Sequence, residues 1–381
     1  MEIWAFNLRH LAAFAATVRL GSLSAAAQEI SLTQPAVTQA LAKLERLIGE
    51  TMFERSQGGM VATDAARLFA RRVEDALRHI ASPRVTMAQM RALIELADAG
   101  SYAGASAATG LSQPTLHRAV GDLAIALRRA LVERRGKGVA ITPGGRRTLR
   151  SFRLARAELS AGLSEVCSLR GREVGRITIG AMPLCRARLL PAAVMGFHRE
   201  YPGVKIRIVE GSHAELIEPL RDGDIDLLLG ALREVPLGDD VEQCRLFDDQ
   251  PVVLARADHP LAGVSQVDIN ALSAYSWTIS AHGTPLRTLW EKMFSHNCVA
   301  TPQVPIECGS VITIRQMLLD SDMLTMLSPD QAVLELEAGW LIKIAAPTQM
   351  LRRTIGMTSR ARWRPTPAQA RFVELLKSSL S

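Results

Sequence analysis

The spacing of apolar residues over the first 80 positions predicts a small helical unit that ends in a hairpin. Apolar side chains recur every three or four residues, as in helices that bury one face, over 8–18, 37–48 and 66–80. A short alanine-rich helix over 24–30, with Ser24 as its expected N-cap, precedes the middle helix. Two short strands at 52–55 and 61–62 flank a glycine-containing turn. This order is typical of a helix-turn-helix followed by a wing.

The helix expected after Thr33 has one apolar face and one polar face. The Thr33 hydroxyl can cap it, and Pro35 fits its first turn, where a missing N–H costs nothing. Amide and hydroxyl side chains on the polar face can hydrogen-bond base edges in a major groove. The candidates for base contacts are Gln34, Pro35, Thr38 and Gln39, with Arg55 of the wing on the DNA backbone. The alternative is an exposed polar face without a role in binding.

The same pattern returns after a shift of 79 residues without a gap, so Leu32-Thr33-Gln34-Pro35 meets Leu111-Ser112-Gln113-Pro114. Thr86 and Gln89 predict a capping box at the first helix of this second copy. An internal repeat of this length is one supersecondary unit used twice. The second set of candidate DNA contacts is Gln113, Pro114, His117 and Arg118, with Arg135 and Lys137 of the wing on phosphates. Alternatively, the second copy serves only as a packing or dimerisation module.

Charge and cysteine placement narrow the class of protein. The chain has 381 residues and a net charge of +7, and residues 84–156 hold 13 basic against 4 acidic residues. A basic segment of this kind favours a polyanion partner over a merely solvated arginine-rich helix. Five scattered cysteines without a Cys-x-x-Cys pair favour a reducing compartment over disulfides or zinc. No signal peptide and no apolar run of roughly 20 residues is present, so we expect a cytoplasmic protein without a membrane partner.

The pattern changes in the second half of the chain. Apolar residues continue at helical spacing over 149–169, which suggests a long helix suited to dimer pairing. From Gly175 onward, strands alternate with helices, which predicts parallel sheets covered by helices. Two such α/β lobes crossed twice by the chain make a clamshell with a ligand between them.

These motifs together resemble the LysR-type transcriptional regulators. The resemblance is carried by Phe14, Gly21-Ser22, Leu32-Thr33-Gln34-Pro35, Leu44-Glu45 and Phe53-Glu54-Arg55, and later by Gly175–Gly180, Tyr201-Pro202 and Asp258-His259-Pro260. It implies a multi-domain fold: two all-α winged helix-turn-helix units followed by a two-lobed α/β effector domain like the periplasmic binding proteins. It also implies double-stranded promoter DNA and a small-molecule effector as partners, and a homodimer or homotetramer. The family normally has one reader unit, whereas this chain has two.

The expected boundaries follow from these patterns. They are winged helix-turn-helix 1 over 1–66, linker helix 1 over 67–83, winged helix-turn-helix 2 over 84–145, a linker or dimerisation helix over 146–172, and an effector-binding domain over 173–381. Within the last domain we expect lobe I over 173–250 and 330–381, and lobe II over 251–329.

The resemblance places the effector at loops that follow strands. The corresponding positions are Met182, Pro183, Leu184, Ser212, His213, His282, Thr284 and Ser310. Thr284 and Ser310 precede helices whose free N–H groups can hold a carboxylate, so we expect a small organic anion. The alternative for His213 and His282 is that they are ordinary loop histidines.

Motifs for catalysis are missing from the sequence. No His-Glu-x-x-His, Gly-x-Ser-x-Gly or Gly-Lys-Ser/Thr motif occurs, so we expect no enzyme activity, no catalytic residues, no metal and no cofactor. The prediction is therefore a DNA-binding regulator modulated by an effector. The alternative is a constitutive architectural DNA-binding protein, or a solute-binding protein, in which one of the two activities has decayed.

Overall fold

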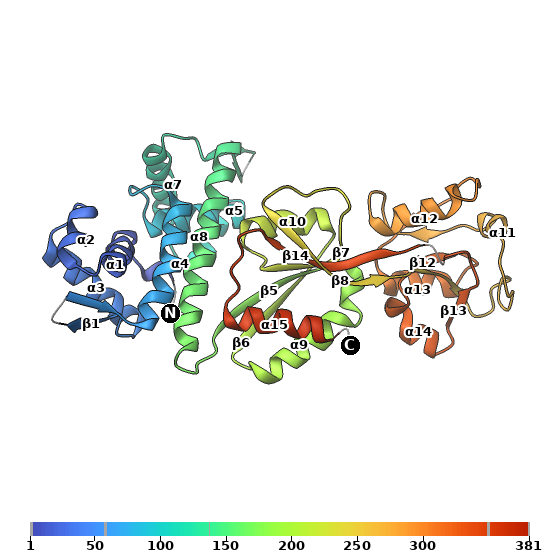
Figure 1. Cartoon of the computed structure of the whole chain (residues 1–381). Helices are drawn as coiled ribbons and strands as arrows, with labels where there is room; N and C mark the ends of the chain where they lie inside the picture. Colours follow the sequence, from blue (N-terminus) through green and yellow to red (C-terminus); the bar gives the residue numbers. More distant parts are fainter. Residues whose placement is uncertain (1–2, 57–58, 137, 349–350, 380–381) are drawn as a thin grey trace. The chain divides into compact units, whose positions relative to one another are not determined.

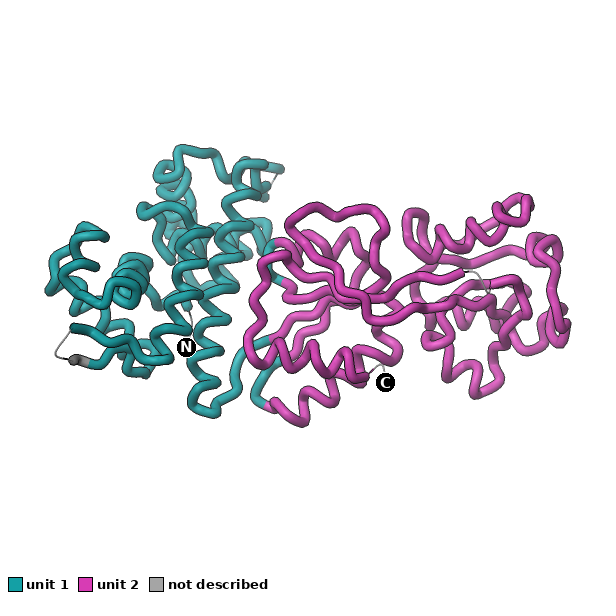
Figure 2. The backbone as a smooth tube through the Cα atoms, in the orientation of Figure 1, with its two compact units in different colours: residues 1–176, 203–205, 222–224 teal, residues 177–202, 206–221, 225–381 magenta. Residues whose placement is uncertain are grey.

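The computed structural model describes residues 3–56, 59–136, 138–348 and 351–379. The chain divides into two compact units (Figure 2). The first holds the residues up to 176 together with 203–205 and 222–224, and the second holds the rest. No helix among the described residues is long and apolar enough to cross a membrane.

The first unit contains two copies of the same winged helix-turn-helix (Figure 1). The first copy consists of η1 (Ile3–Ala5), α1 (Leu8–Leu20), α2 (Leu23–Glu29), α3 (Gln34–Ile48), β1 (Phe53–Ser56), β2 (Gly59–Ala62) and α4 (Asp64–Ile80). The second consists of α5 (Met87–Ala99), α6 (Tyr102–Thr109), α7 (Gln113–Leu127), β3 (Val132–Arg135), β4 (Gly138–Ile141) and α8 (Pro143–Ser168). In each copy the two strands pair antiparallel and form the wing. The turn residues Gln57 and Gly58 lie outside the described residues.

Side-chain caps determine where most of these helices begin. The capping box of Thr86 and Gln89 is confirmed, because each side chain accepts a hydrogen bond from the other residue's backbone N–H. The predicted cap Ser24 is wrong. Ser22 has extended backbone and its hydroxyl accepts from the N–H of Ala25 at 3.3 Å, so α2 begins at Leu23. The Ser24 hydroxyl is left free to bond elsewhere.

The apolar stripe of α8 is buried inside the chain, contrary to the expectation that it would serve a dimer. Phe152, Leu159 and Val166 are at most 1% exposed. They belong to one core that also contains Phe69 and Val73 of α4. The internal repeat explains this difference, because it supplies a second amphipathic helix within the same chain to cover the stripe.

Lobe I of the second unit is built on a five-stranded sheet in the order β6-β5-β7-β14-β8. The strands are β5 (Gly175–Ala181), β6 (Val204–Glu210), β7 (Leu227–Ala231), β8 (Val241–Asp249) and β14 (Arg353–Arg360). Its helices are η2 (Pro183–Arg186), α9 (Leu189–Glu200), α10 (His213–Asp222) and α15 (Pro367–Ser378). Helix α15 packs on α9, with the rings of Phe197 and Phe372 at 5.5 Å between centroids.

Lobe II has a three-stranded sheet in the order β12-β9-β13 and a separate parallel pair, β10 and β11. The strands are β9 (Val252–Arg256), β10 (Thr278–Ile279), β11 (Ile306–Glu307), β12 (Thr325–Leu327) and β13 (Leu341–Ile344). The helices are α11 (Ile269–Ser273), α12 (Pro285–Ser295), α13 (Val311–Leu319), η3 (Pro329–Ala332) and α14 (Val333–Glu337). Its core centres on Trp277, Trp290 and Phe294, whose rings meet edge to face.

Two expectations about these lobes are wrong. The sheets are not purely parallel: β5 and β7 are parallel, but β14 runs antiparallel to β7 and β8, and β12 and β13 run antiparallel to β9. The chain leaves lobe I after β8 and returns along β14, so these two strands have opposite directions. The return also comes later than residue 330, because β13 still pairs with β9 of lobe II. Strand β8 was not expected, since its exposed charged residues hide the alternation of a sheet edge.

Candidate functional site

Helix α3, which the sequence predicts to read DNA in the first copy (the first reader helix), presents all four predicted contact residues to solvent. Its apolar face is buried through Val37, Leu41 and Leu44. The exposed side chains on the other face are Gln34, Pro35, Thr38 and Gln39. The Thr33 hydroxyl accepts from the N–H of Ala36 at 3.4 Å, which confirms the predicted cap and sets where the helix begins.

A hydrogen bond from the preceding helix orients Gln34. The Ser24 hydroxyl donates to Gln34 Oε1 at 3.1 Å. This leaves the amide N–H groups of Gln34 available to donate to an acceptor on a base. The sequence interpretation missed Ser24 as a functional residue because it had assigned its hydroxyl to a helix cap.

Backbone contacts attach each wing to the start of its own helix-turn-helix in the same way. The N–H of Met60 donates to the Gly21 oxygen at 3.2 Å, and the N–H of Val139 donates to the Gly100 oxygen at 3.1 Å. The first copy has an additional contact, because Glu45 Oε1 accepts from the N–H of Met52 at 2.7 Å. Residue 124 is alanine at the matching position of the second copy. The two wings are therefore attached by the same backbone hydrogen bond, but only the first has a glutamate at this position to hold its first strand.

Helix α7, the predicted reader helix of the second copy, also exposes its predicted contact residues. Gln113, Pro114, His117 and Arg118 are all exposed. The Ser112 hydroxyl caps the helix by accepting from the N–H of Thr115 at 3.3 Å. On the wing, Arg135 is exposed, whereas Lys137 lies outside the described residues. The backbone of Arg55 lies in β1 of the first wing.

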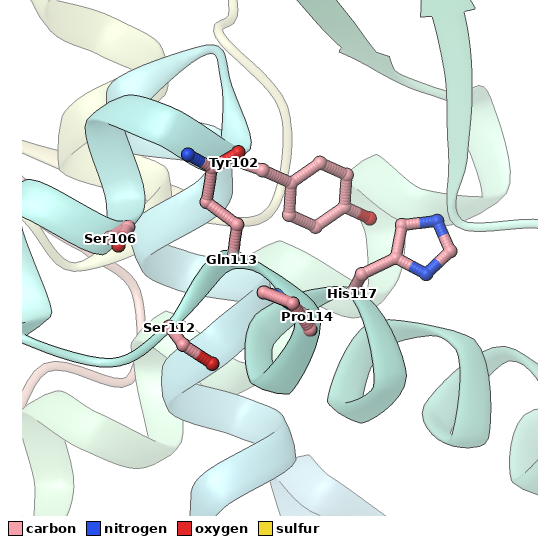
Figure 3. A pocket seen from close by; sticks show the side chains of 6 residues that line it. All are labelled: Tyr102, Ser106, Ser112, Gln113, Pro114 and His117. Carbon is pink, nitrogen blue, oxygen red and sulfur yellow. The ribbon is translucent and has the colours of Figure 1, made fainter.

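A surface pocket of about 610 Å³ lies at the N-terminus of α7 (Figure 3). It is lined by Tyr102, Ser106, Ser112, Gln113, Pro114 and His117. The rings of Tyr102 and His117 lie 5.2 Å apart between centroids, and burial raises the pKa of Tyr102. The sequence did not predict Tyr102 as a site residue, because only its contact with His117 in the folded chain indicates a role. At the matching positions of the first copy, Leu23 and Thr38 replace Tyr102 and His117, so this pair of rings is particular to the second copy.

The predicted effector residues lie in both lobes. Met182 follows β5, Pro183 and Leu184 form the start of η2, and Ser212 and His213 open α10 in lobe I. In lobe II, His282 lies in the loop before α12, and Thr284 and Ser310 are the N-caps of α12 and α13. The Thr284 hydroxyl accepts from the N–H of Arg287 at 3.3 Å, and the Ser310 hydroxyl accepts from the N–H of Thr313 at 3.4 Å.

Carboxylates of the chain already occupy two of these positions. Glu215 Oε2 accepts from both the N–H and the hydroxyl of Ser212 at 2.8 Å. His282 lies between Glu291 at 3.2 Å and Glu307 at 3.6 Å. The donors of Ser212 and the ring of His282 are therefore largely satisfied within the chain.

Arg233, which the sequence interpretation missed, lies near two of the other predicted effector positions, His213 and the loop before α12. Its NH1 group donates to the Gly283 oxygen at 3.0 Å, so a lobe I residue reaches the loop before α12. Burial, followed by the charges of Arg233 and Arg221, lowers the pKa of His213. His213 Nε2 is buried and has no hydrogen-bond partner among the described residues. Arg221 is paired with Glu218 and Asp240, whereas no carboxylate partner of Arg233 is found among the described residues. A partly buried arginine without an acidic partner is suited to a negatively charged ligand. The sequence feature that could have indicated Arg233 is its position just after the end of a predicted strand.

Comparison with known proteins identifies both halves of the chain. Residues 170–381 match the family model described as the LysR substrate binding domain. Residues 8–67 and 87–146 each match the model for the bacterial regulatory helix-turn-helix protein, lysR family. The two matches confirm the internal repeat.

Relatives and solved structures agree with these matches. The HTH-type transcriptional regulator GalR of Pseudomonas putida is 27% identical over 388 aligned positions, which cover 98% of each chain. The regulator PcaQ of Agrobacterium fabrum is 26% identical and covers 74% of this chain and 91% of its own. A full-length OxyR variant from Pseudomonas aeruginosa matches with a TM-score of 0.58 at 24% identity, over 77% of this chain and 93% of its own. CbnR, a LysR family regulator, matches with a TM-score of 0.55 at 19% identity, over 77% of this chain and 98% of its own.

The fold and both family matches thus lead to one conclusion. The chain belongs to the LysR family: it is a DNA-binding transcriptional regulator with two helix-turn-helix copies and a C-terminal domain that binds a small-molecule effector.

Proposed function

We propose that both reader helices contact promoter DNA in the major groove. The observation that carries this proposal is that α3 and α7 each begin at a hydroxyl cap, expose the same positions and have the same attachment of the wing. The proposed base contacts are Gln34, Pro35, Thr38 and Gln39 in the first copy and Gln113, Pro114, His117 and Arg118 in the second. Arg55, Arg135 and Lys137 are the proposed phosphate contacts.

Separate substitutions of the two glutamines test this proposal. Gln34→Ala and Gln113→Ala should each weaken binding to the chain's own upstream DNA, by about 1–3 kcal/mol, which is the value of a good side-chain contact to a base. Gln316→Ala, which removes an exposed glutamine of α13, is the matched control. Affinity is measured over a range of salt concentrations, because phosphate contacts dominate at low salt. If Gln113→Ala binds like the unchanged protein at every salt concentration, α7 is not a reader.

We further propose that the effector is a small organic anion, and that its binding changes how the protein binds or bends promoter DNA. The support is the basic environment of His213 and Arg233, together with the N-termini of α12 and α13 at Thr284 and Ser310. Met182, Pro183, Leu184, Ser212 and His282 then act as lining residues. Helix N-termini and a partly buried arginine both favour a carboxylate.

A titration calorimetry panel of small carboxylates tests the effector proposal. A ligand that binds the unchanged protein should bind Arg233→Gln at least about tenfold more weakly, since charged hydrogen bonds contribute about 1.5–3 kcal/mol. Arg245→Gln is the control, because Arg245 is exposed and its ion pair is with Asp248 at the sheet edge. Binding that is equally strong in Arg233→Gln would rule out this site.

We also propose a homodimer or homotetramer, formed through the second unit. Strand β6 is at an edge of its sheet and carries Ile208, which is 44% exposed. Met195 of α9 is 52% exposed. Exposed apolar groups at a sheet edge are typical of an association surface. Sedimentation of Ile208→Glu should show a smaller species than the unchanged protein, and an unchanged mass would argue against this surface.

A further inference from the structure

Helices α4 and α8, each of which follows the wing of one copy, pack against each other along their length within one chain (Figure 1). The contact is close. A Cβ at Gly162 of α8 would lie 2.8 Å from Phe69 Cδ2 and 2.9 Å from Arg72 Cβ of α4. Only glycine therefore allows the two helices to approach this closely at that point.

A buried ion-pair cluster connects the same two helices. The side chain of Arg72 is 1% exposed. Its NH1 group lies 2.9 Å from Glu158 Oε2, and its Nε donates to Glu165 Oε1 at 3.1 Å. The hydrogen bonds and charges of these two carboxylates outweigh the effect of burial and raise the pKa of Arg72. A buried pair with several fixed hydrogen bonds favours one register of the two helices over others.

The two copies also share one hydrophobic core. It contains Leu11 and Phe14 of α1, Phe69 of α4, and Met90 and Leu93 of α5. Because packed cores resist sliding and rotation, the two copies keep one relative arrangement. We propose that each chain is a covalently linked pseudo-dimer of DNA readers, which binds a complete operator with two half-sites by itself. This inference rests on the proposal that both reader helices contact DNA.

Of three matching contact positions, the two readers share the glutamine and differ at the other two, so their half-sites should differ as well. Gln34 corresponds to Gln113, Thr38 to His117, and Gln39 to Arg118. Glutamine pairs with adenine and the threonine methyl group with the thymine methyl group, whereas arginine bonds two acceptors of guanine. The first reader therefore fits an A·T-containing half-site, and the second fits a half-site with a guanine.

Neighbouring residues strengthen this difference. Ser24, which orients Gln34, corresponds to Ala103 in the second copy, where no hydroxyl is present. Gln113 instead lies beside Tyr102 and His117 in the pocket of Figure 3. The operator of one chain is thus a pair of unlike half-sites in a fixed order and not a palindrome.

Selection of binding sites from random duplex DNA by the full-length protein tests this inference. The expected product is a bipartite site with unlike halves at one separation. Arg118→Ala should relax base preference in the guanine half only, and Gln39→Ala in the other half only. Adding five base pairs between the halves turns the second half to the opposite face of the duplex, and should weaken binding at least tenfold. A palindromic product, or tolerance of the added base pairs, would overturn the inference.

Mixed oligomers show whether the two readers of one operator belong to the same chain. Gln39→Ala and Arg118→Ala chains with different tags are co-expressed, and oligomers that carry both tags are purified. If the two readers of an operator belong to one chain, every chain of the mixed oligomer has one impaired reader, and its affinity for DNA stays as low as that of either variant. If full affinity returns, the readers pair between chains and the pseudo-dimer is excluded.

The glutamine substitutions separate this inference from the proposal beneath it. If neither Gln34→Ala nor Gln113→Ala weakens binding, the reader assignment itself fails. If both weaken binding and mixed oligomers recover affinity, only the pseudo-dimer fails. Binding of one bipartite site per chain of the oligomer supports it directly.

Discussion

Replacing Arg72 by methionine tests whether the buried ion pairs hold α4 and α8 together. Methionine keeps an unbranched apolar side chain of similar length but removes Arg72 as the ion-pair partner of Glu158 and Glu165. Removing one partner of a buried ion pair costs about 3–5 kcal/mol, because the remaining charge stays buried. The side chains of Glu158 and Glu165 are 18% and 10% exposed, so water can reach them in part. We therefore expect a loss near the lower end, about 3 kcal/mol in the free energy of unfolding of the first unit.

The measurement is urea unfolding of the full-length protein, followed by far-ultraviolet circular dichroism and by loss of DNA binding. Because the chain has two compact units, each can unfold in its own transition. The transition that appears both in circular dichroism and in the loss of DNA binding is assigned to the first unit, which contains the helix-turn-helix copies. Arg71→Met is the matched control. Arg71 neighbours Arg72 on α4 but is exposed, and surface substitutions change stability by no more than about 0.5 kcal/mol.

Restoring neutrality should recover the stability. Adding Glu158→Gln and Glu165→Gln to Arg72→Met removes both carboxylate charges, and a buried neutral amide costs much less than a buried charge that has lost its ion-pair partner. A loss below about 1 kcal/mol for Arg72→Met would refute the role given to this cluster. Failure of the combined variant to recover would show instead that packing, and not charge, dominates at this position.

Three further outcomes are expected. Burial and two nearby arginines lower the pKa of His213, so the folded protein favours its neutral form. The contribution of His213 to the free energy of unfolding is therefore complete above its ordinary pKa of about 6.5 and is lost as the pH falls below that value. His213→Gln should flatten that loss in unfolding measured between pH 7 and 5. Gly145→Ala should destabilise by at least about 2 kcal/mol, since its Cβ would lie 2.0 Å from a backbone oxygen, whereas Gly121→Ala in the open middle of α7 should stabilise by about 0.5–1 kcal/mol in urea unfolding. Burial raises the pKa of Cys185 to about 12, so alkylation at pH 8 should modify exposed Cys244 first, as peptide mass spectrometry would show.

Most of the DNA-binding region could be predicted because its signals are local. The apolar spacing and the caps at Thr33 and Ser112 depend on neighbours within one or two turns of helix. One error was equally local: Ser22, and not the predicted Ser24, has the extended backbone of a cap and begins α2. The effector region was less predictable. Arg233 has meaning only through its contact with Gly283, which lies 50 residues away in the other lobe.

The sequence by itself determined the two copies, their helices and the family, since repeats, periodicity and capping residues can be recognised in the order of the residues. Only the tertiary structure decided that α8 pairs with α4 of the same chain. An apolar stripe records that a helix needs a partner, but not which one, because the hydrophobic effect is not directional. The choice is made by Gly162 and by the carboxylates on either side of Arg72, which complement each other only when residues some 90 positions apart are brought together.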